Sequence, residues 1–223
     1  MVGTEGTPDA DAVTGFFISV EGVDGSGKTT QAGQLAESLS RDGHQVQVVR
    51  DPGTTALGER LRALLLEPAA DWALEGWAET ALFLAGRVQL TAEVVRPALE
   101  SGAVVISDRY IDSSLVYQGA RSIPWEAILE LHRICGADLK PDLTLILDLE
   151  ISAARGRREG QPSLDRLESE PTTYHEKVRA GYLEVARRFP ERAVLVSADR
   201  SPEAVARDCL ELARARLQPR RAV

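Results

Sequence analysis

The sequence predicts an α/β fold of three layers, in which a five-stranded parallel sheet is flanked by helices. Short β-branched or aliphatic runs alternate with longer stretches of helical periodicity, which is the pattern of repeated strand–helix units. Several runs are almost continuously apolar, as strands covered on both faces must be. The 223 residues suffice for one such domain and are too few for two with sizeable cores.

Five segments have the length and composition of strands. In order they are 16–21 (FFISVE), 45–49 (QVQVV), 103–107 (AVVIS), 143–148 (LTLILD) and 193–197 (AVLVS). Each is short and rich in β-branched or aliphatic residues.

Helical stretches separate these strands and follow the last one. They are predicted at 29–39, 57–66, 72–100, 125–135, 171–188 and 202–217, with a break near Gly86 left open in the third. A helix after each strand predicts parallel pairing through right-handed crossovers.

Composition sets the class of protein. Residues 1–14 are polar and rich in Gly, Thr, Asp and Pro, so we expect a flexible tail and no signal peptide ahead of a single domain at 15–218. The net charge of −8 disfavours non-specific binding to nucleic acid or to anionic membranes. Cys135 and Cys209 form no CxxC pair, which argues against a disulfide framework. We expect a cytoplasmic protein.

A phosphate-binding loop follows the first expected strand. Residues 22–29 read GVDGSGKT and match GxxxxGK(S/T) at every fixed position, with a helical stretch directly after them. In this setting successive backbone N–H groups and a helix N-terminus surround a phosphate. Lys28 is expected to reach the β- and γ-phosphates of ATP, and Thr29 to ligate Mg²⁺. The predicted nucleotide-binding residues are Gly22, Val23, Asp24, Gly25, Ser26, Gly27, Lys28, Thr29 and Thr30.

Two alternatives to an ATP-binding loop fit the sequence less well. A glycine-rich turn that matches by chance is disfavoured by the strand before the motif and the helix after it. A GTPase needs an NKxD-type motif to read guanine, and the chain contains no asparagine.

An acid and an arginine stand at the end of the third expected strand. Asp108 is placed to hold Mg²⁺, and Arg109 lies at the sheet edge where ligands bind in open α/β folds. A guanidinium there suits bidentate phosphate binding. Asp148 ends the fourth strand and competes for the metal role, although it lacks an adjacent arginine. The plain alternative for Asp108 and Arg109 is a salt-bridged strand end.

Residues 155–170 (RGRREGQPSLDRLESE) break the strand–helix rhythm. Dense charge with Gly and Pro is typical of a solvated loop. The arginines and the position after the fourth strand also fit a lid over a nucleotide.

Together these motifs resemble the thymidylate kinase family, whose members phosphorylate dTMP to dTDP. The resemblance runs from Phe16 to about Leu217. Its motifs are GVDGSGKTT, RDPG at 50–53, LRALLLE at 61–67, LFLAGR at 82–87, SDRYIDSSLVYQG at 107–119, PDLTLILD at 141–148 and LDRLE at 164–168. The resemblance implies a P-loop nucleoside monophosphate kinase-like fold, with ATP and dTMP as substrates and Mg²⁺ as cofactor.

The resemblance also implies which residues hold the base and the deoxyribose. Phe83 would stack on thymine, and Arg87, four residues on, would donate to a base carbonyl. Ser114 and Gln118 would read the pyrimidine edge, and Tyr117 would crowd the sugar's 2′ position. Without the family, Phe83 would be a core residue, and the segment from Ser114 to Gln118 an ordinary helix start.

Charged residues would hold the phosphates and the sugar. Asp51 would lie near the acceptor phosphate and Mg²⁺, and Arg62 near the base, although a surface helix arginine is an equally good reading. Asp24 would accept from the sugar 3′-hydroxyl or order waters, acting in catalysis with Lys28 and Arg109.

The lid arginines take on a role that the loop lacks. Some relatives carry an arginine in the phosphate loop where this chain has Gly25, so the lid would supply that charge. Arg155 would lie against adenine, and either Arg157 or Arg158 would reach the transferred phosphoryl group. Residues 160–163 are extra relative to the family, Thr54 replaces a usual glycine, and some relatives have Asn where this chain has Ser114.

A homodimer is implied by the family, through apolar faces of 57–67 and 72–100. Two other functions stay open. A deoxynucleoside kinase on the same fold would use Asp51 as a base toward a hydroxyl acceptor, and a nucleotide-binding regulator would have lost turnover. A DNA-bound ATPase fits the acidic charge poorly.

Overall fold

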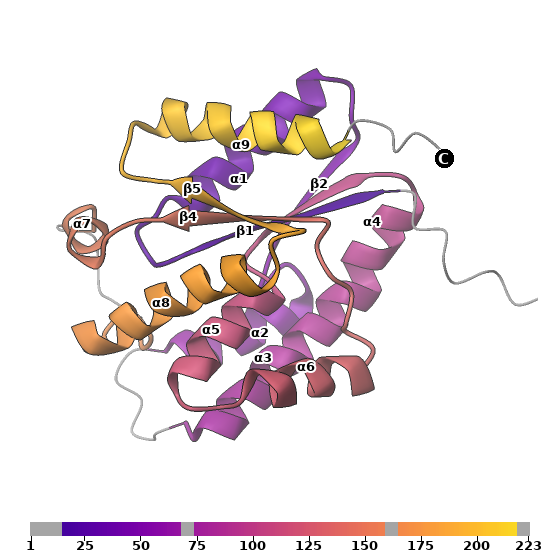
Figure 1. The fold of residues 1–223 in the computed structure, drawn as a ribbon. Helices are drawn as coiled ribbons and strands as arrows, with labels where there is room; N and C mark the ends of the chain where they lie inside the picture. The colour runs from indigo at the N-terminus through magenta and orange to yellow at the C-terminus, as the bar shows by residue number, and fades with distance from the viewer. Residues whose placement is uncertain (1–14, 68–73, 159–164, 218–223) are drawn as a thin grey trace, which may run out of the picture.

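The computed structural model describes residues 15–67, 74–158 and 165–217, and its centre is a five-stranded parallel sheet (Figure 1). The strand order is β2-β3-β1-β4-β5, which confirms the predicted sheet. The strands are β1 (Phe16–Gly22), β2 (Val46–Arg50), β3 (Val104–Asp108), β4 (Leu143–Asp148) and β5 (Ala193–Ser197).

Strand burial follows strand position. The central strands β1, β3 and β4 are almost wholly buried, whereas the edge strands β2 and β5 expose about half of their side chains. Continuous apolar character in the sequence therefore identified the strands that are covered on both faces. The register pairs Val20 with Asp108 and Gly22 with Leu147, so the phosphate loop leaves the sheet between the ends of β3 and β4.

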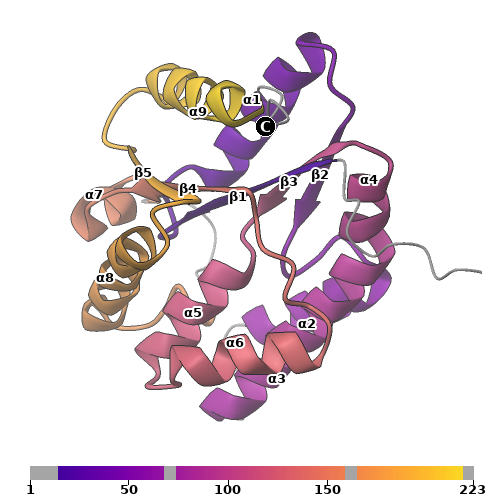
Figure 2. The ribbon, with the colours of Figure 1, turned by 45° about the vertical axis from the view of Figure 1, so that its right-hand side comes forward.

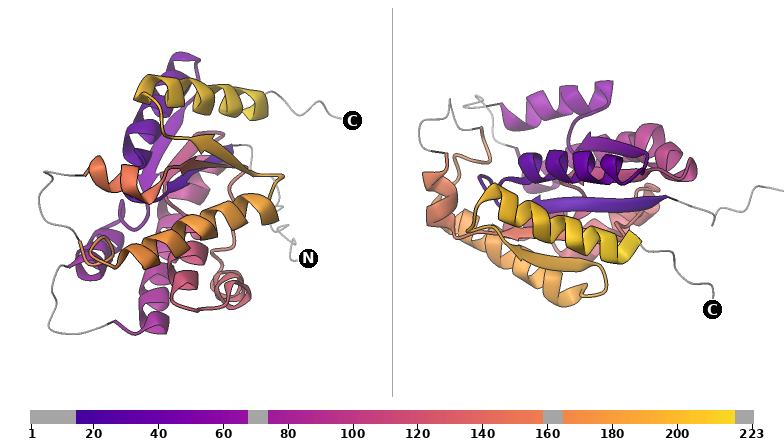
Figure 3. Two further views of the ribbon diagram at one scale, coloured as in Figure 1. Left: turned by 60° about the vertical axis from the view of Figure 1, so that its left-hand side comes forward. Right: turned by 90° about the horizontal axis from the view of Figure 1, so that it is seen from above.

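Helices cover both faces of the sheet and complete three layers (Figures 1 and 2). On one face lie α1 (Lys28–Arg41) and α9 (Pro202–Leu217), which pack side by side. The other face carries α8 (Thr172–Arg188), α5 (Ile111–Ala120) and the long helical segment that precedes β3 (Figure 3). Outside them pack α2 (Ala56–Leu66) and α6 (Trp125–Ile134), and α7 (Ile151–Gly156) lies beyond β4.

The long segment before β3 is one uninterrupted helical path. It consists of α3 (Gly76–Leu90), a π-helical turn at Thr91–Val95 and α4 (Arg96–Glu100). A break at Gly86 is therefore wrong: this glycine faces Leu61 of α2, where a small residue allows close packing. The irregularity lies at the π turn, because Pro97 follows it and its ring cannot fit the regular i−4 geometry.

Two short helices follow strand ends and were not predicted as separate elements. These are α5, which directly follows the Asp108–Arg109 strand end, and α7, which opens the expected lid. The start of the predicted 72–100 helix lies outside the described residues, as do residues 1–14. None of the described helices is both long and apolar enough to cross a membrane.

Candidate active site

The phosphate loop connects β1 to α1 and closes on itself. The backbone N–H of Ser26 donates to the carbonyl of Val23 (3.1 Å), and Lys28 Nζ donates to the same carbonyl (2.9 Å). Lys28 is buried and lies 3.6 Å from Asp24 Oδ1. Burial and the Arg109 guanidinium lower the pKa of Lys28 to about 8. The ammonium is thus held at the loop, desolvated, where an anion would gain most from it.

Gly25 shows why the loop carries no arginine at this position. Its backbone is left-handed (φ 84°), and a Cβ would lie 2.5 Å from the carbonyl oxygen of Ala154 in α7. The side chain of Arg158 also lies within van der Waals reach of that position. The space that a loop arginine would occupy is filled by the start of the expected lid.

Thr29 and Asp108 meet at the end of β3. The Thr29 hydroxyl donates to Asp108 Oδ2 at 2.5 Å, and both residues line the cavity next to the loop. Asp148, the competing acid, instead binds Arg179 through both oxygens (2.8 and 3.1 Å) and is absent from that cavity wall. Among the described residues, no three His, Cys, Asp or Glu side chains cluster as a protein-only metal cage.

Arg109 has a left-handed backbone (φ 69°), which is costly for a residue with a side chain. Buried contacts hold it there. The next backbone N–H, of Tyr110, donates to Glu21 Oε1 (2.7 Å), and the Ser107 hydroxyl donates to the Arg109 carbonyl (2.5 Å). The guanidinium then reaches across the loop and donates to the carbonyl of Gly22 (3.2 Å). The strain aims Arg109 back over the phosphate loop.

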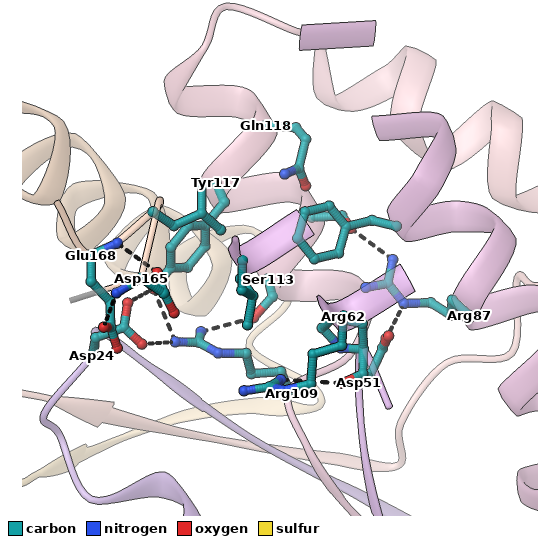
Figure 4. Close-up of a pocket in the computed structure, with 15 residues that line it drawn as sticks. Asp24, Asp51, Arg62, Arg87, Arg109, Ser113, Tyr117, Gln118, Asp165 and Glu168 are labelled. Carbon is teal, nitrogen blue, oxygen red and sulfur yellow. Dashed lines mark hydrogen bonds and ion pairs between the residues drawn. The ribbon is translucent and has the colours of Figure 1, made fainter. Parts of the chain in front are cut away.

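Asp24 is the partner of Arg109 inside the loop. It binds Arg109 Nη2 and accepts a hydrogen bond from the Tyr117 hydroxyl (3.0 Å). Burial favours its neutral form, but Arg109, Lys28 and Tyr117 outweigh that effect and hold the pKa of this carboxyl well below its usual range. Asp24 is therefore an acceptor throughout the physiological range (Figure 4).

A second cavity, between α3 and α5, brings together the residues assigned to the acceptor. Phe83 is nearly buried and also belongs to the hydrophobic core. It shares the cavity wall with the other expected acceptor-site residues: Asp51, Arg62, Arg87, Arg109, Ser114, Tyr117 and Gln118. Residues from separate segments of the sequence thus line one cavity (Figure 4).

Arg87 is fixed from three sides inside this cavity. Its Nε donates to Asp51 Oδ2 (2.5 Å), and its Nη1 donates to Ser114 Oγ (2.7 Å) and faces His132 Nε2 (2.8 Å). Burial and Arg87 lower the pKa of His132 to about 4, so the ring is neutral at pH 7. Its Nδ1 donates to the Ile128 carbonyl, which leaves Nε2 as the acceptor. No described residue bonds Nη2 of Arg87.

Arg62 lies between the two cavities. Arg62 donates to the Pro52 carbonyl (3.1 Å). It lines both the cavity between α3 and α5, called the base cavity below, and the cavity beside the phosphate loop. Its position therefore suits a phosphate as well as a base.

Thr54 adopts a left-handed backbone (φ 67°), the conformation that a glycine adopts without strain. Its hydroxyl accepts from the Arg50 N–H (2.8 Å) and holds the loop shape.

The described part of the expected lid comprises 155–158 and 165–170, and residues 159–164 lie outside the described residues. Arg158 pairs with Glu168 (2.5 Å), and Arg157 donates to the Ala198 carbonyl (2.7 Å). Both arginines line the cavity with Lys28, whereas Arg155 lines neighbouring grooves along α7.

Several residues at the site were not assigned from the sequence. The cavity between α3 and α5 is also lined by Asp165, Leu167 and Glu168. These residues belong to the LDRLE motif, which could have indicated their place at the site. Glu21 binds the hydroxyls of Ser113 (2.7 Å) and Tyr182 (3.0 Å), and an acid inside an apolar strand was the signal there. Burial, reinforced by the nearby Asp112, raises the pKa of Glu21.

Comparison with known proteins gives one consistent result. A model of the thymidylate kinase family matches residues 20–209. The chain is 40% identical to a thymidylate kinase of Exiguobacterium sp. and 43% identical to one of Desulforudis audaxviator. These matches cover 92% and 93% of this chain and 97% and 94% of the relatives.

A solved structure agrees with the sequence comparisons. The crystal structure of thymidylate kinase from Ehrlichia chaffeensis matches with a TM-score of 0.73 and 30% identity, over 89% of this chain and 98% of that chain. The five-stranded order, the phosphate loop and the family motifs coincide in this chain. The chain belongs to the thymidylate kinase family.

Proposed function

We propose that the protein transfers the γ-phosphoryl group of ATP to dTMP. The observation that carries this proposal is that the base cavity and the cavity beside the phosphate loop share walls. Asp24, Asp51, Arg62 and Arg109 line both. A nucleotide whose base lies near Phe83 would place its phosphate at this boundary, facing the γ-phosphate held by the loop.

Charge neutralisation and alignment carry the transfer. The acceptor is a phosphate oxygen that is already ionised at neutral pH, so no general base is required. Two approaching anions repel each other. Arg62 and Arg109, which line both cavities, would offset that repulsion together with Lys28 beside the phosphate loop. Asp24 holds Arg109 and, by accepting from Tyr117, keeps the phenol at the expected sugar position.

The site fits Mg²⁺ as its cofactor. Hydroxyl and carboxylate oxygens are ligands that Mg²⁺ takes alongside waters and substrate phosphates. Thr29 and Asp108 supply such oxygens 2.5 Å apart. In the same cavity, Asp51 has a buried Oδ1 with no hydrogen-bond partner in the described structure. When bound, the ion would supply positive charge to the transferring phosphoryl group.

The cavity beside the phosphate loop also supports the proposed lid, because two arginines of that segment line it. Arg157 and Arg158 lie at the end of α7, next to the loop. An arginine aimed at the transferred group can be worth 10³-fold or more in related reactions, roughly. We assign the 155–170 segment as the lid, with Arg155 toward the adenine side.

We also propose that the protein forms a homodimer through α2 and α3. Large apolar side chains are exposed on α2 and α3, namely Leu57, Leu64 and Trp77. Leu57 and Leu64 are seven residues apart and share one face of α2. Apolar surface of this kind is typical of a partner interface.

The experiment that tests the function separates it from its two rivals. Purified protein is incubated with Mg·ATP and either dTMP or thymidine, and the products are resolved by chromatography. We expect ADP and dTDP from dTMP and no dTMP from thymidine. Phosphorylation of thymidine alone would establish a deoxynucleoside kinase, and no ADP with either acceptor would establish a regulator. Lys28→Ala, with folding checked by circular dichroism, is the inactive control.

A further inference from the structure

Gln118 lines the base cavity, and its amide has two chemically opposite ends. The side chain is buried, and Nε2 donates to Glu79 Oε1 at 2.9 Å. No described residue donates to Oε1, which points toward the cavity interior (Figure 4). The cavity therefore receives a hydrogen-bond acceptor from Gln118.

Glu79 decides which end of that amide faces the base. Its side chain is fully buried on α3 and is held by two arginines. Arg121 Nε donates to Oε1 (3.2 Å), and Arg166 Nη2 donates to Oε2 (2.7 Å). An ionised carboxylate only accepts hydrogen bonds. A flipped Gln118 amide would set its oxygen against that carboxylate, where two buried acceptors repel each other.

Arg87, which lines the same cavity, has the complementary character. Arg87 can only donate, and Asp51, Ser114 and His132 hold its guanidinium in place. A donor beside an acceptor matches a pyrimidine with a carbonyl at C4 and an N–H at N3, as in thymine and uracil. Cytosine has the reverse pair, an amino group at C4 and an acceptor at N3, so both contacts would fail.

We propose that Glu79 is a positioning residue that sets the hydrogen-bonding polarity of the base cavity through Gln118 and so excludes cytosine. This inference rests on the proposed function, because it assigns the reading of the base at the same site. The competing view is that Glu79 serves only as a buried counter-ion for Arg121 and Arg166. That structural role would affect stability and turnover without changing which base is preferred.

The test compares kcat/KM for dTMP, dUMP and dCMP in wild type and Glu79→Gln. An amide at position 79 can donate to a flipped Gln118, which then offers its NH₂ to the base. We expect the dTMP-to-dCMP ratio of kcat/KM to fall by on the order of 10–100-fold, the value of one mismatched buried hydrogen bond. The dTMP-to-dUMP ratio should not change, because those bases share the same N3–H and C4 carbonyl.

Arg166→Gln is the matched control, since it removes a partner of Glu79 and leaves the bond to Gln118 intact. Its dTMP-to-dCMP ratio should stay at the wild-type value. An equal fall in this control, or an unchanged ratio in Glu79→Gln, would overturn the proposal. A wild type that does not phosphorylate dTMP would instead refute the proposed function.

Gln118→Met tests the same relay if Glu79→Gln does not fold. Methionine has a similar volume and no amide, so the base preference should fall in this variant too. Combined with Glu79→Gln, it should cause no further fall, because Glu79 acts through Gln118. An unchanged ratio in Gln118→Met would overturn the proposal without the other variant.

Discussion

Individual cationic side chains at this site are held in place by neighbouring groups. Lys28 donates to a loop carbonyl and lies 3.6 Å from Asp24, and Arg109 binds Asp24 and Tyr117. Each cation is oriented before a ligand arrives, so little reorganisation is needed when phosphates enter. The strained backbone of Arg109 is part of that arrangement.

Nucleotide affinity should depend on pH through Lys28. Its pKa of about 8 lies below the ordinary lysine value, so the ammonium is charged below pH 8 and loses its proton as the pH rises through 8. We expect the Kd for ADP, measured by calorimetry from pH 6.5 to 9.5, to be flat at first and then to rise, approaching tenfold per pH unit, roughly.

Lys28→Arg is the control for this titration. A guanidinium stays protonated over the whole range, so its affinity, although weaker, should not bend near pH 8. A wild-type Kd that stays constant to pH 9.5 would contradict the charge state assigned to Lys28.

Residues within the family motifs could be assigned roles from the sequence, whereas the residues that hold them in place could not. Arg87 and Gln118 belong to motifs with family roles. Their partners, His132 and Glu79, come from other helices, and nothing local in the sequence indicates that His132 accepts from an arginine 45 residues away. Only tertiary packing brings such groups together, so sequence spacing could not supply them.

Among the elements, the phosphate loop and α7 approach each other closely at Gly25. We expect Gly25→Ala to lower the free energy of unfolding by about 1–3 kcal/mol, because its φ is positive and a Cβ would meet the Ala154 carbonyl at 2.5 Å. Urea denaturation monitored by tryptophan fluorescence measures the change.

Gly33→Ala is the matched control in the adjacent helix. Gly33 is exposed within α1, and nothing lies within 4 Å of an added Cβ. Alanine there should raise the free energy of unfolding by about 0.5–1 kcal/mol. Equal effects in the two variants would contradict the close approach of α7 to the loop.

The two lid arginines should differ in their effects on turnover. Arg158 pairs with Glu168 of the proposed lid segment, whereas Arg157 is bound to the carbonyl of Ala198 after β5. We expect Arg158→Ala to lower kcat by on the order of 10³-fold and Arg157→Ala to have the smaller effect. Steady-state assays at saturating ATP and dTMP decide between them, and a larger loss in Arg157→Ala would reverse the assignment.

Element prediction succeeded where periodicity was long and failed at short or irregular segments. The five strands and the long α8 and α9 helices follow directly from apolar patterning. The six-residue α7 is too short to show a helical period, and the π turn at Thr91–Val95 reflects a backbone adjustment before Pro97. The pattern of apolar residues indicates which face of an element is buried, but it does not indicate a single short helix or a π turn.

At the scale of the whole molecule, an acidic chain surrounds a cationic centre. The net charge is −8, yet Lys28, Arg62, Arg109, Arg157 and Arg158 all face one cavity at the carboxyl ends of the strands. Parallel topology brings these distant segments to one edge of the sheet. The sequence therefore indicated the place of the site through topology rather than through overall charge.

The proposed dimer gives a prediction for the intact protein. Trp77→Glu places a charge on a side chain that is 44% exposed on α3, a helix that packs against α2 with its exposed leucines. If this face is an interface, the variant should elute as a monomer while wild type is a dimer, as measured by light scattering after size exclusion. Leu183→Glu, at a similarly exposed site on α8, should remain dimeric. A monomeric wild type would contradict the interface.

A crystal structure with dTMP, Mg²⁺ and a non-hydrolysable ATP analogue would show whether the two nucleotides meet at the boundary between the two cavities. We expect the triphosphate within the 22–29 loop, thymine beside Phe83 with N3 facing Gln118, and the dTMP phosphate next to Arg109. Binding of either nucleotide away from the two joined cavities, or a thymine turned away from Gln118 and Arg87, would contradict this arrangement.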